Sequence, residues 1–218
     1  PTSCTIVCAD LVIDGSVRAS VWPVLGVRTG KVSISNADWS DMGPMFQAEG
    51  LEIAIDMASL FGDAPRINAV EAVAPVLMLE RAADGRENWV FGGDSGGTIS
   101  TATPGVGTSY TLEKAVISGG RLVFLDHKAG TRLELSDMAV TTAVPDFAGE
   151  VRVDLAAVKD GQAFALDLTF GAFRSFLDGK LGPLTAEFSA GKAQGQFTGQ
   201  AGWKPMAAKG DLVADLGR

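Results

Sequence analysis

A glycine-rich segment around Ser95 is the part of this sequence that most resembles a catalytic site. Gly93-Asp94-Ser95-Gly96-Gly97 has the residue pattern that surrounds the nucleophile in one class of serine proteases. Such a serine needs a histidine base, and that class places its histidine and aspartate before the serine. The single histidine, His127, comes after Ser95. A five-residue match without its partners is weak evidence. We therefore expect no enzyme, and we keep a serine hydrolase using Ser95 as the least favoured alternative.

The other residue types that could support chemistry are few. His127 lies in the polar segment Asp126-His127-Lys128-Ala129-Gly130, which predicts a hairpin turn at the surface. Cys4 and Cys8 would lie about 13 Å apart on a strand, too far for a disulfide bond, although turned backbone could bring them together. A metal site needs a cluster of ligands that one histidine and two cysteines do not suggest. We expect no cofactor and no metal.

The composition narrows the class of partner. The chain has 218 residues, a formal charge of −8 and 46% hydrophobic side chains. An acidic surface repels the phosphates of nucleic acids, so we expect no nucleic-acid partner. No apolar run reaches the ~18 residues that a membrane-spanning helix needs.

Short segments of alternating apolar and polar residues indicate a β-rich fold. Period-two alternation bounded by Gly, Pro, Asn or Asp predicts strands with unlike faces, and it occurs at 31–36, 51–56, 121–124, 131–136, 151–155, 164–170 and 184–188. We expect a mainly β, largely antiparallel meander with one or two short helices, at 173–177 and 57–61. The chain is predicted to be a single domain, 1–218, whose two halves are joined by a flexible loop near 92–107, a tract rich in Gly, Ser and Thr.

A weak internal repeat flanks this loop. Val73-Ala74-Pro75-Val76-Leu77-Met78-Leu79 precedes it and Ser118-Gly119-Gly120-Arg121-Leu122-Val123-Phe124 follows it, each reading as a turn and then a strand. Such similarity is expected where a sheet grows by adding similar units.

The alternation also predicts which side chains share a face. The candidates for one apolar face are Leu77, Leu79, Leu122, Phe124, Leu133, Leu135, Val153, Leu166 and Phe170. With few helices to cover it, such a face either curls into a filled core or remains a groove that acyl chains can occupy. The sequence leaves both alternatives open.

The segment from Pro75 to Trp89 resembles a signature of the AsmA-like family, within the AsmA/TamB group of bridge-like lipid-transfer proteins. It has an apolar strand after Pro75, the acidic-basic pair Glu80-Arg81, and Asp84-Gly85-Arg86-Glu87-Asn88-Trp89. Upstream, Val12 to Gly15, Ser20 to Pro23 and Val32 to Ala37 are similar in order and spacing to the family's opening strands. The loop 36–40 departs from the family pattern.

The resemblance implies a curved, trough-like sheet in the N-terminal periplasmic part of such a protein. It implies a location in the periplasm of a Gram-negative bacterium, with an inner-membrane anchor that we expect before Pro1. The partner would be phospholipid or another acyl lipid, conducted toward the outer membrane, and no catalytic residues are implied. A scaffold that assists outer-membrane protein assembly through exposed strand edges is the alternative.

Overall fold

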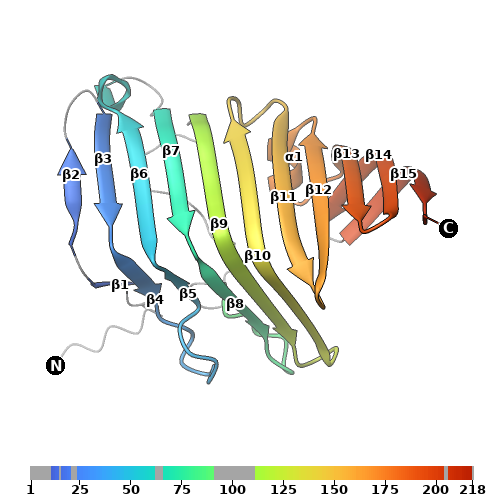
Figure 1. The fold of residues 1–218 in the computed structure, drawn as a ribbon, viewed down its shortest axis with the longest axis horizontal. Coiled ribbons are helices and arrows are strands. Elements are labelled where there is room, and N and C mark those ends of the chain that lie inside the picture. Colours follow the sequence, from blue (N-terminus) through green and yellow to red (C-terminus); the bar gives the residue numbers. More distant parts are fainter. Residues whose placement is uncertain are drawn as a thin grey trace.

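The computed structural model describes residues 11–14, 16–20, 24–61, 66–90, 111–203 and 206–217, which form one open, mixed, mostly antiparallel sheet. The strands of these residues run β1 (Leu11–Asp14), β2 (Arg18–Ser20), β3 (Val24–Thr29), β4 (Lys31–Ile34), β5 (Phe46–Ala48), β6 (Gly50–Asp56), β7 (Arg66–Val73), β8 (Val76–Arg81), β9 (Thr111–Asp126), β10 (Thr131–Val144), β11 (Val151–Lys159), β12 (Gln162–Phe170), β13 (Gly182–Ala190), β14 (Ala193–Trp203) and β15 (Met206–Asp215). The mainly β prediction is confirmed (Figure 1). Within these residues no helix is long and apolar enough to span a membrane.

Both short helical segments form where the spacing predicts them. The α-helix α1 covers Phe173–Leu177, and a 3₁₀ helix covers Met57–Phe61. All seven alternating segments fall within strands or extend one residue or two beyond them. The predicted loop near 92–107, with Ser95, and the two cysteines lie outside the described residues.

The strand order differs from a simple meander in the N-terminal part. From β9 to β15 each strand pairs antiparallel with the next, and the predicted antiparallel meander corresponds to β9 to β13 of this run. Before β9 the order is different, because β7 and β8 both pair with β9 in parallel. The strands β1, β4, β5 and β8 lie below β2, β3, β6 and β7 in Figure 1, and β9 and β10 run through both levels. We call these two levels the lower sheet and the upper sheet.

A row of left-handed residues separates the two levels. Ala74, Gly119 and Asp137 have φ angles of 46°, 63° and 50°, and they lie at matching heights in three adjacent strand lines. We call this row the crease. Backbone hydrogen bonds continue the pairing through it, from the Ala74 N–H to Ser118 O and from the Arg121 N–H to Pro75 O, each at 2.7 Å. The crease therefore bends the sheet without breaking it (Figure 1).

The internal repeat of the sequence corresponds to this arrangement. Val73 pairs with Ser118, Leu77 with Leu122, and Leu79 with Phe124, so the two similar segments lie side by side in parallel. Their left-handed residues, Ala74 and Gly119, occupy equivalent positions. The two copies of the repeat are therefore adjacent parallel strand segments, and each has a left-handed residue at the crease.

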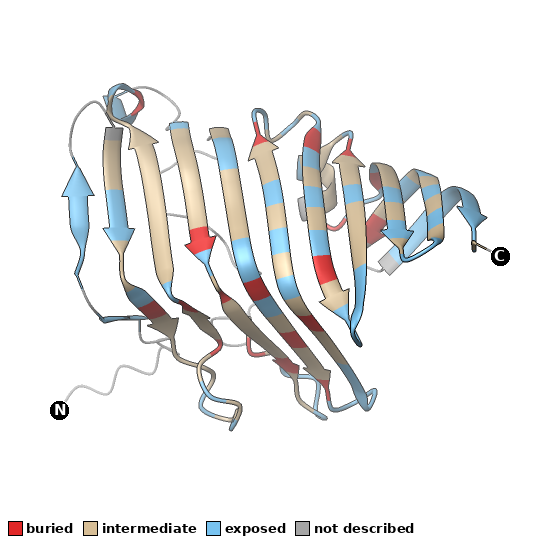
Figure 2. Cartoon of the chain, in the orientation of Figure 1, coloured by how far each residue is buried: buried red, intermediate tan, exposed pale blue. Residues whose placement is uncertain are grey.

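The sheet remains open, and few of its apolar side chains are fully buried. Figure 2 shows mostly intermediate and exposed residues along the strands. The buried apolar residues of the described part are Val32, Met45, Ala48, Ala72, Val123, Leu135, Val144, Val151, Ala157 and Phe170. They are spread across both levels and do not form one compact core.

The left-handed backbone of the crease predicts that glycine is more favourable than alanine at both position 74 and position 119. A left-handed φ costs a non-glycine residue about 1–2 kcal/mol, and glycine in a strand costs roughly 0.5–1 kcal/mol in conformational entropy. Ala74→Gly should therefore raise the free energy of unfolding by about 0.5–1 kcal/mol, and Gly119→Ala should lower it by a similar amount. Urea denaturation measures both. Ala69→Gly in the interior of β7 is the control and should destabilise; an equal loss in Ala74→Gly would contradict the role of the crease.

Candidate functional site: an apolar face of the open sheet

The lower sheet brings six of the nine predicted residues onto one face. Direct partners in neighbouring strands point to the same side of a sheet. Leu77 pairs with Leu122, which pairs with Leu135. In the next row Leu79 pairs with Phe124, which pairs with Leu133.

The other three residues lie on the same face of the upper sheet. Val153 pairs with Leu168, Leu155 with Leu166, and Val151 with Phe170, so these rows alternate regularly along β11 and β12. The face continues across β10, where Val140 partners both Leu155 and Ile117.

The crease keeps the two levels in phase. Ile117 and Leu122 are five residues apart, a spacing that would put them on opposite faces of a regular strand. The register shifts at the crease, so that the pairs Leu122–Leu135, Gly120–Met138 and Ile117–Val140 follow one another on one face. All nine predicted residues therefore share one face, which we call the apolar face.

Many more residues of this face were absent from the nine candidates. The cross-strand pairs add Leu51, Ile53, Val70, Ala72, Ile117, Val140, Leu155, Leu168, Leu184, Ala186, Phe188, Phe197 and Leu212. The signal for most of them was present, because they occupy alternate positions of the strands. What alternation alone cannot provide is the register that joins one strand to the next.

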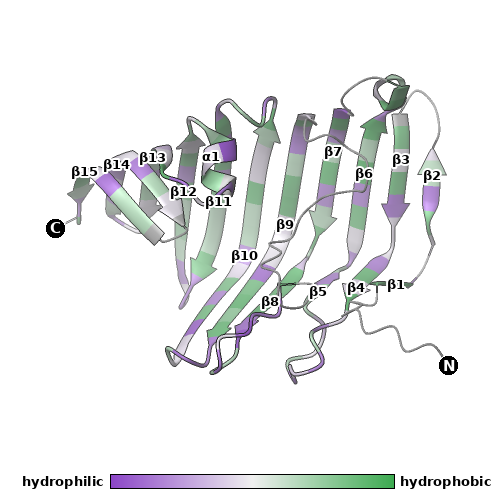
Figure 3. Ribbon diagram, turned by 180° about the vertical axis from the view of Figure 1, so that it is seen from behind, coloured by the Kyte–Doolittle hydropathy of each residue, from purple (hydrophilic) through white to green (hydrophobic). Residues whose placement is uncertain are grey.

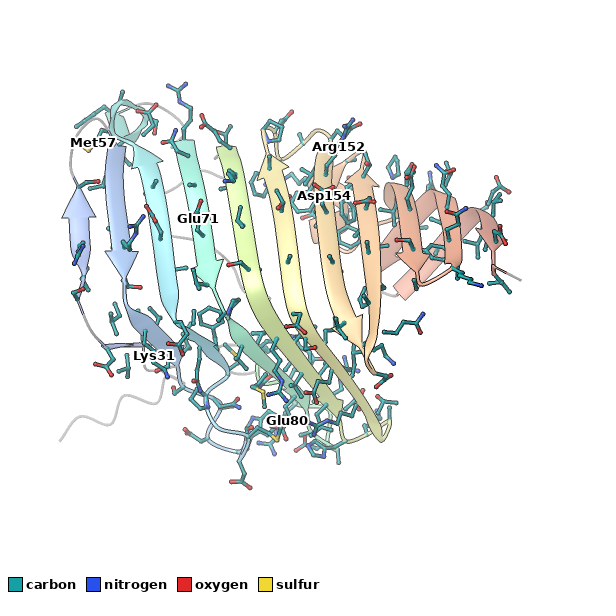
Figure 4. The ribbon with its side chains drawn as sticks, in the orientation of Figure 1. Lys31, Met57, Glu71, Glu80, Arg152 and Asp154 are labelled. Carbon is teal, nitrogen blue, oxygen red and sulfur yellow. The ribbon has the colours of Figure 1, made fainter. Side chains whose placement is uncertain are left out.

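The opposite face, the polar face, carries most of the charge. Glu71 on β7 and Arg152 and Asp154 on β11, labelled in Figure 4, belong to it. Figure 3 shows the resulting alternation of hydrophilic and hydrophobic bands along the strands. Charge on one side and hydrocarbon on the other make this an amphipathic sheet.

Two predicted residues of the apolar face are packed against other aromatic rings of the chain. The Phe124 ring lies 6.0 Å from that of Trp89, and the Phe170 ring lies 4.6 Å from that of Phe176 in α1. Phe170 is 7% exposed and Leu135 is 9% exposed. The remaining seven, including Leu166, are half-buried. Helix α1 is seen in front of β11 and β12 in Figure 3, on the side of the apolar face.

Polar groups bound the apolar face at both ends of β9. Glu113 accepts a hydrogen bond from the Asn68 amide at 3.1 Å at one end. At the other, Arg81 donates to Asp126 at 3.0 Å and to Glu87 at 2.7 Å. The backbone N–H of Ala129 and then the Arg81 guanidinium lower the pKa of Asp126, and the hydrogen bond to Glu87 raises the pKa of Arg81. Asp126 and Arg81 therefore stay charged at neutral pH.

A second polar cluster lies beside this end, on the polar face. The Ser40 hydroxyl donates to one carboxylate oxygen of Glu80, and Nε2 of His127 lies 2.6 Å from the other. The carboxylate lies between serine and histidine, so the imidazole is not placed to take the serine proton as a general base does. His127 occupies the predicted turn after β9, half-exposed. The cluster fastens the loop after β4 to β8.

The side chain of Asn88, in the signature segment, makes the hydrogen bonds to the backbone of β8 that a neighbouring strand would otherwise make. It accepts from the Glu80 N–H at 2.8 Å and donates to Met78 O at 2.8 Å and to the Asn36 side chain at 2.9 Å. Asn88 is only 2% exposed. The signature residues around it also make structural contacts: Asp84 accepts hydrogen bonds from Arg86, and Arg86 lies over the Trp39 ring at 5.0 Å.

A shallow hollow elsewhere in the structure has a mixed polar and apolar lining. It measures about 500 Å³ and lies over β12 to β15, where Asp167, Glu187 and Asp215 contribute carboxylates. None of the nine predicted residues lines it. Among the residues that the structure describes, no group of three or more His, Cys, Asp or Glu is arranged to hold a metal ion.

Comparison with known proteins adds no relative. No protein-family model matches the chain, and neither the curated proteins nor the solved structures contain a significant match.

The contacts of Asn88 predict a large loss of stability when they are removed. Asn88→Ala leaves the Glu80 N–H and Met78 C=O without their partner in a buried place, at about 1–3 kcal/mol each. We expect a loss of roughly 2–4 kcal/mol in the free energy of unfolding by urea denaturation. Gln200→Ala, at an exposed position of β14, should change it by less than about 0.5 kcal/mol. Equal effects of the two substitutions would contradict the structural role of Asn88.

Proposed function

We propose that this chain is a non-enzymatic module that binds or conducts lipid acyl chains on its apolar face. The observation that carries the proposal is the continuity of that face: apolar side chains follow one another from β6 to β15 on one side of an open sheet. Half-buried apolar surface of this extent is typical of an interaction site.

The chemistry of the face suits hydrocarbon. The ladder between strands uses the backbone N–H and C=O groups of the interior strands, so the face presents side chains alone. Those side chains have almost no hydrogen-bonding groups, and a ligand that meets them must therefore need none. Acyl chains meet this condition, and removing both surfaces from water yields about 25 cal/mol for each Å² of apolar area.

The dimensions of the face also suit acyl chains. On β9 the apolar positions extend from Ala115 to Phe124, about 30 Å at the rise of a strand. The hydrocarbon core of a bilayer is about 30 Å thick, so one acyl chain needs about half of that length. Glu113 and Asp126 lie just beyond the two ends, where polar headgroups could remain in water.

The resemblance of residues 75–89 to the AsmA-like family supports a cellular location for this activity. On that basis we propose that the chain works in the periplasm of a Gram-negative bacterium, tethered to the inner membrane in the full-length protein, and that the lipid is phospholipid or another acyl lipid that passes between the inner and outer membranes. The amphipathic open sheet agrees with the trough that the resemblance implies.

A carboxylate on the apolar face tests the proposal. Leu166 is half-buried, so the glutamate of Leu166→Glu can reach water and the fold should survive, with only a small change in melting temperature. An unpaired charge among hydrocarbon is costly, so co-purifying lipid should fall about tenfold or more. Ala156→Glu, exposed on the polar face of β11, is the matched control and should retain its lipid.

Native mass spectrometry after organic extraction measures the bound lipid of each variant. Lipid on the parent protein and on Ala156→Glu, with loss from folded Leu166→Glu, is the expected outcome. A parent protein that carries no lipid, or a Leu166→Glu variant that unfolds, would contradict the proposal and indicate a face packed for stability.

A further inference from the structure

The most exposed large hydrophobic side chain of the described residues lies in the 3₁₀ helix that follows β6, at the upper end of the sheet. Phe61 is 89% exposed, and its neighbour Leu60 is 45% exposed. Both belong to Met57–Phe61, a segment without a charged residue. Figure 4 labels Met57, where this helix begins. We call the helix the apolar tip.

The burial of the apolar tip is the reverse of what an ordinary turn shows. Its one buried residue is polar, Ser59, which is 5% exposed, whereas Leu60 and Phe61 face water. Apolar side chains are usually the ones that a turn buries, and hydroxyls are usually left in water. Single exposed apolar residues are common on soluble proteins. Two adjacent ones beside a buried serine indicate a surface that meets an apolar partner.

Hydrogen bonds hold the apolar tip in this orientation. The Ser59 hydroxyl donates to Asp56 O at 2.7 Å and accepts from the Arg66 N–H at 2.8 Å. The Ala58 N–H donates to the Asp56 carboxylate at 2.8 Å, and the Arg66 guanidinium lies 3.5 Å from that carboxylate. Ser59 is therefore fixed between the end of β6 and the start of β7. With Ser59 turned inward, the two residues after it remain at the surface.

The charges beside the apolar tip do not oppose its entry into an apolar medium. Asp56 and Arg66 carry opposite charges and lie next to each other, so this pair has no net charge. The turns at the opposite end of the sheet, after β9, β11 and β13, each have an exposed charged residue, namely Lys128, Asp160 and Lys192. The two ends of the sheet therefore differ, and an apolar partner would meet the upper one.

The size of the apolar tip favours a bilayer over a protein partner. A stable protein–protein interface buries about 800 Å² of each partner. A phenylalanine contributes about 150–250 Å² even when it is completely buried. Phe61 and the partly exposed Leu60 therefore fall far short of the area that a stable protein complex needs. A bilayer needs no complementary surface, because its boundary region is fluid, and small apolar groups bind to it reversibly.

We propose that the apolar tip inserts Phe61 and Leu60 into a lipid bilayer, at the boundary between its headgroups and its acyl chains. The contact is weak and reversible, because few apolar side chains take part in it. It places the upper end of the sheet against a membrane surface. The proposal does not rest on acyl-chain binding by the apolar face, so either one can fail without the other.

Flotation with phosphatidylcholine vesicles tests the insertion. These lipids have no net charge, so they neither attract nor repel a chain with a formal charge of −8. Part of the parent protein should float with the vesicles. Phe61→Ser should lower the partition coefficient about tenfold or more, and Phe61→Trp should raise it, since tryptophan favours the membrane interface. Both variants should fold as the parent does, because position 61 is exposed, and circular dichroism checks this.

Two variants elsewhere in the chain are the controls. Val213 on β15 is 72% exposed, so Val213→Ser removes an exposed apolar group far from the apolar tip and should leave the partition coefficient unchanged. Leu166→Glu changes the apolar face and should also retain vesicle binding, whatever its content of extracted lipid.

Four results would overturn the proposal. They are a parent protein that does not float, a Phe61→Ser variant that floats as the parent does, an equal loss of binding in Val213→Ser, and a loss in Leu166→Glu while Phe61→Ser binds fully. The last result would assign the membrane contact to the apolar face. A doubled mass of the parent at sedimentation equilibrium, abolished by Phe61→Ser, would assign the apolar tip to a second copy and would overturn the proposal as well.

Discussion

The sheet depends on keeping one side-chain phase through a bend. A strand alternates its side chains between two faces, so one additional residue reverses every side chain beyond it. At the crease the neighbouring strand lines are interrupted together, with left-handed residues at Ala74, Gly119 and Asp137. These left-handed residues lie at matching heights, so the side-chain alternation shifts by one residue in all three strand lines at the same place. Apolar residues therefore pair with apolar residues on both sides of the bend. An interruption in one strand alone would bring charge onto the apolar face.

This shared phase explains how an open sheet of this length can be amphipathic throughout. The upper and lower levels have different strand orders, yet β9 and β10 cross both and transmit the register. The lower end is then fixed by buried apolar residues such as Val32, Ala48 and Val123 together with buried polar contacts. Among the polar contacts, Asn88 completes the ladder of β8, and Glu80 holds Ser40 and His127.

Several features of this arrangement could be predicted from residue patterns. The similarity of residues 73–79 to 118–124 indicated two equivalent strands, and period-two alternation selected Leu77, Leu122 and seven others that indeed share a face. The parallel pairing of β7 and β8 with β9 could not be predicted, since alternation carries no information on strand order. The strands β14 and β15 were not predicted, because glycines occupy several of their apolar-face positions and so remove the alternation that marks a strand. These glycines are Gly195, Gly199 and Gly210. The Trp89 ring that covers Phe124 comes from an irregular segment, whose position only the folded chain defines, whereas Phe176, which packs on Phe170, belongs to the helix that the spacing predicts at 173–177.

The central claim is that acyl chains lie on the apolar face, and photo-crosslinking tests it most directly. Phosphatidylethanolamine with a diazirine in its acyl chain would be supplied in vesicles, irradiated with the protein, and its adducts located by peptide mass spectrometry. The account predicts adducts at open positions of the apolar face such as Leu79, Leu155 and Leu166, and none at Glu71 or Asp154 on the polar face. Adducts spread equally over both faces, or no adducts at all, would contradict it.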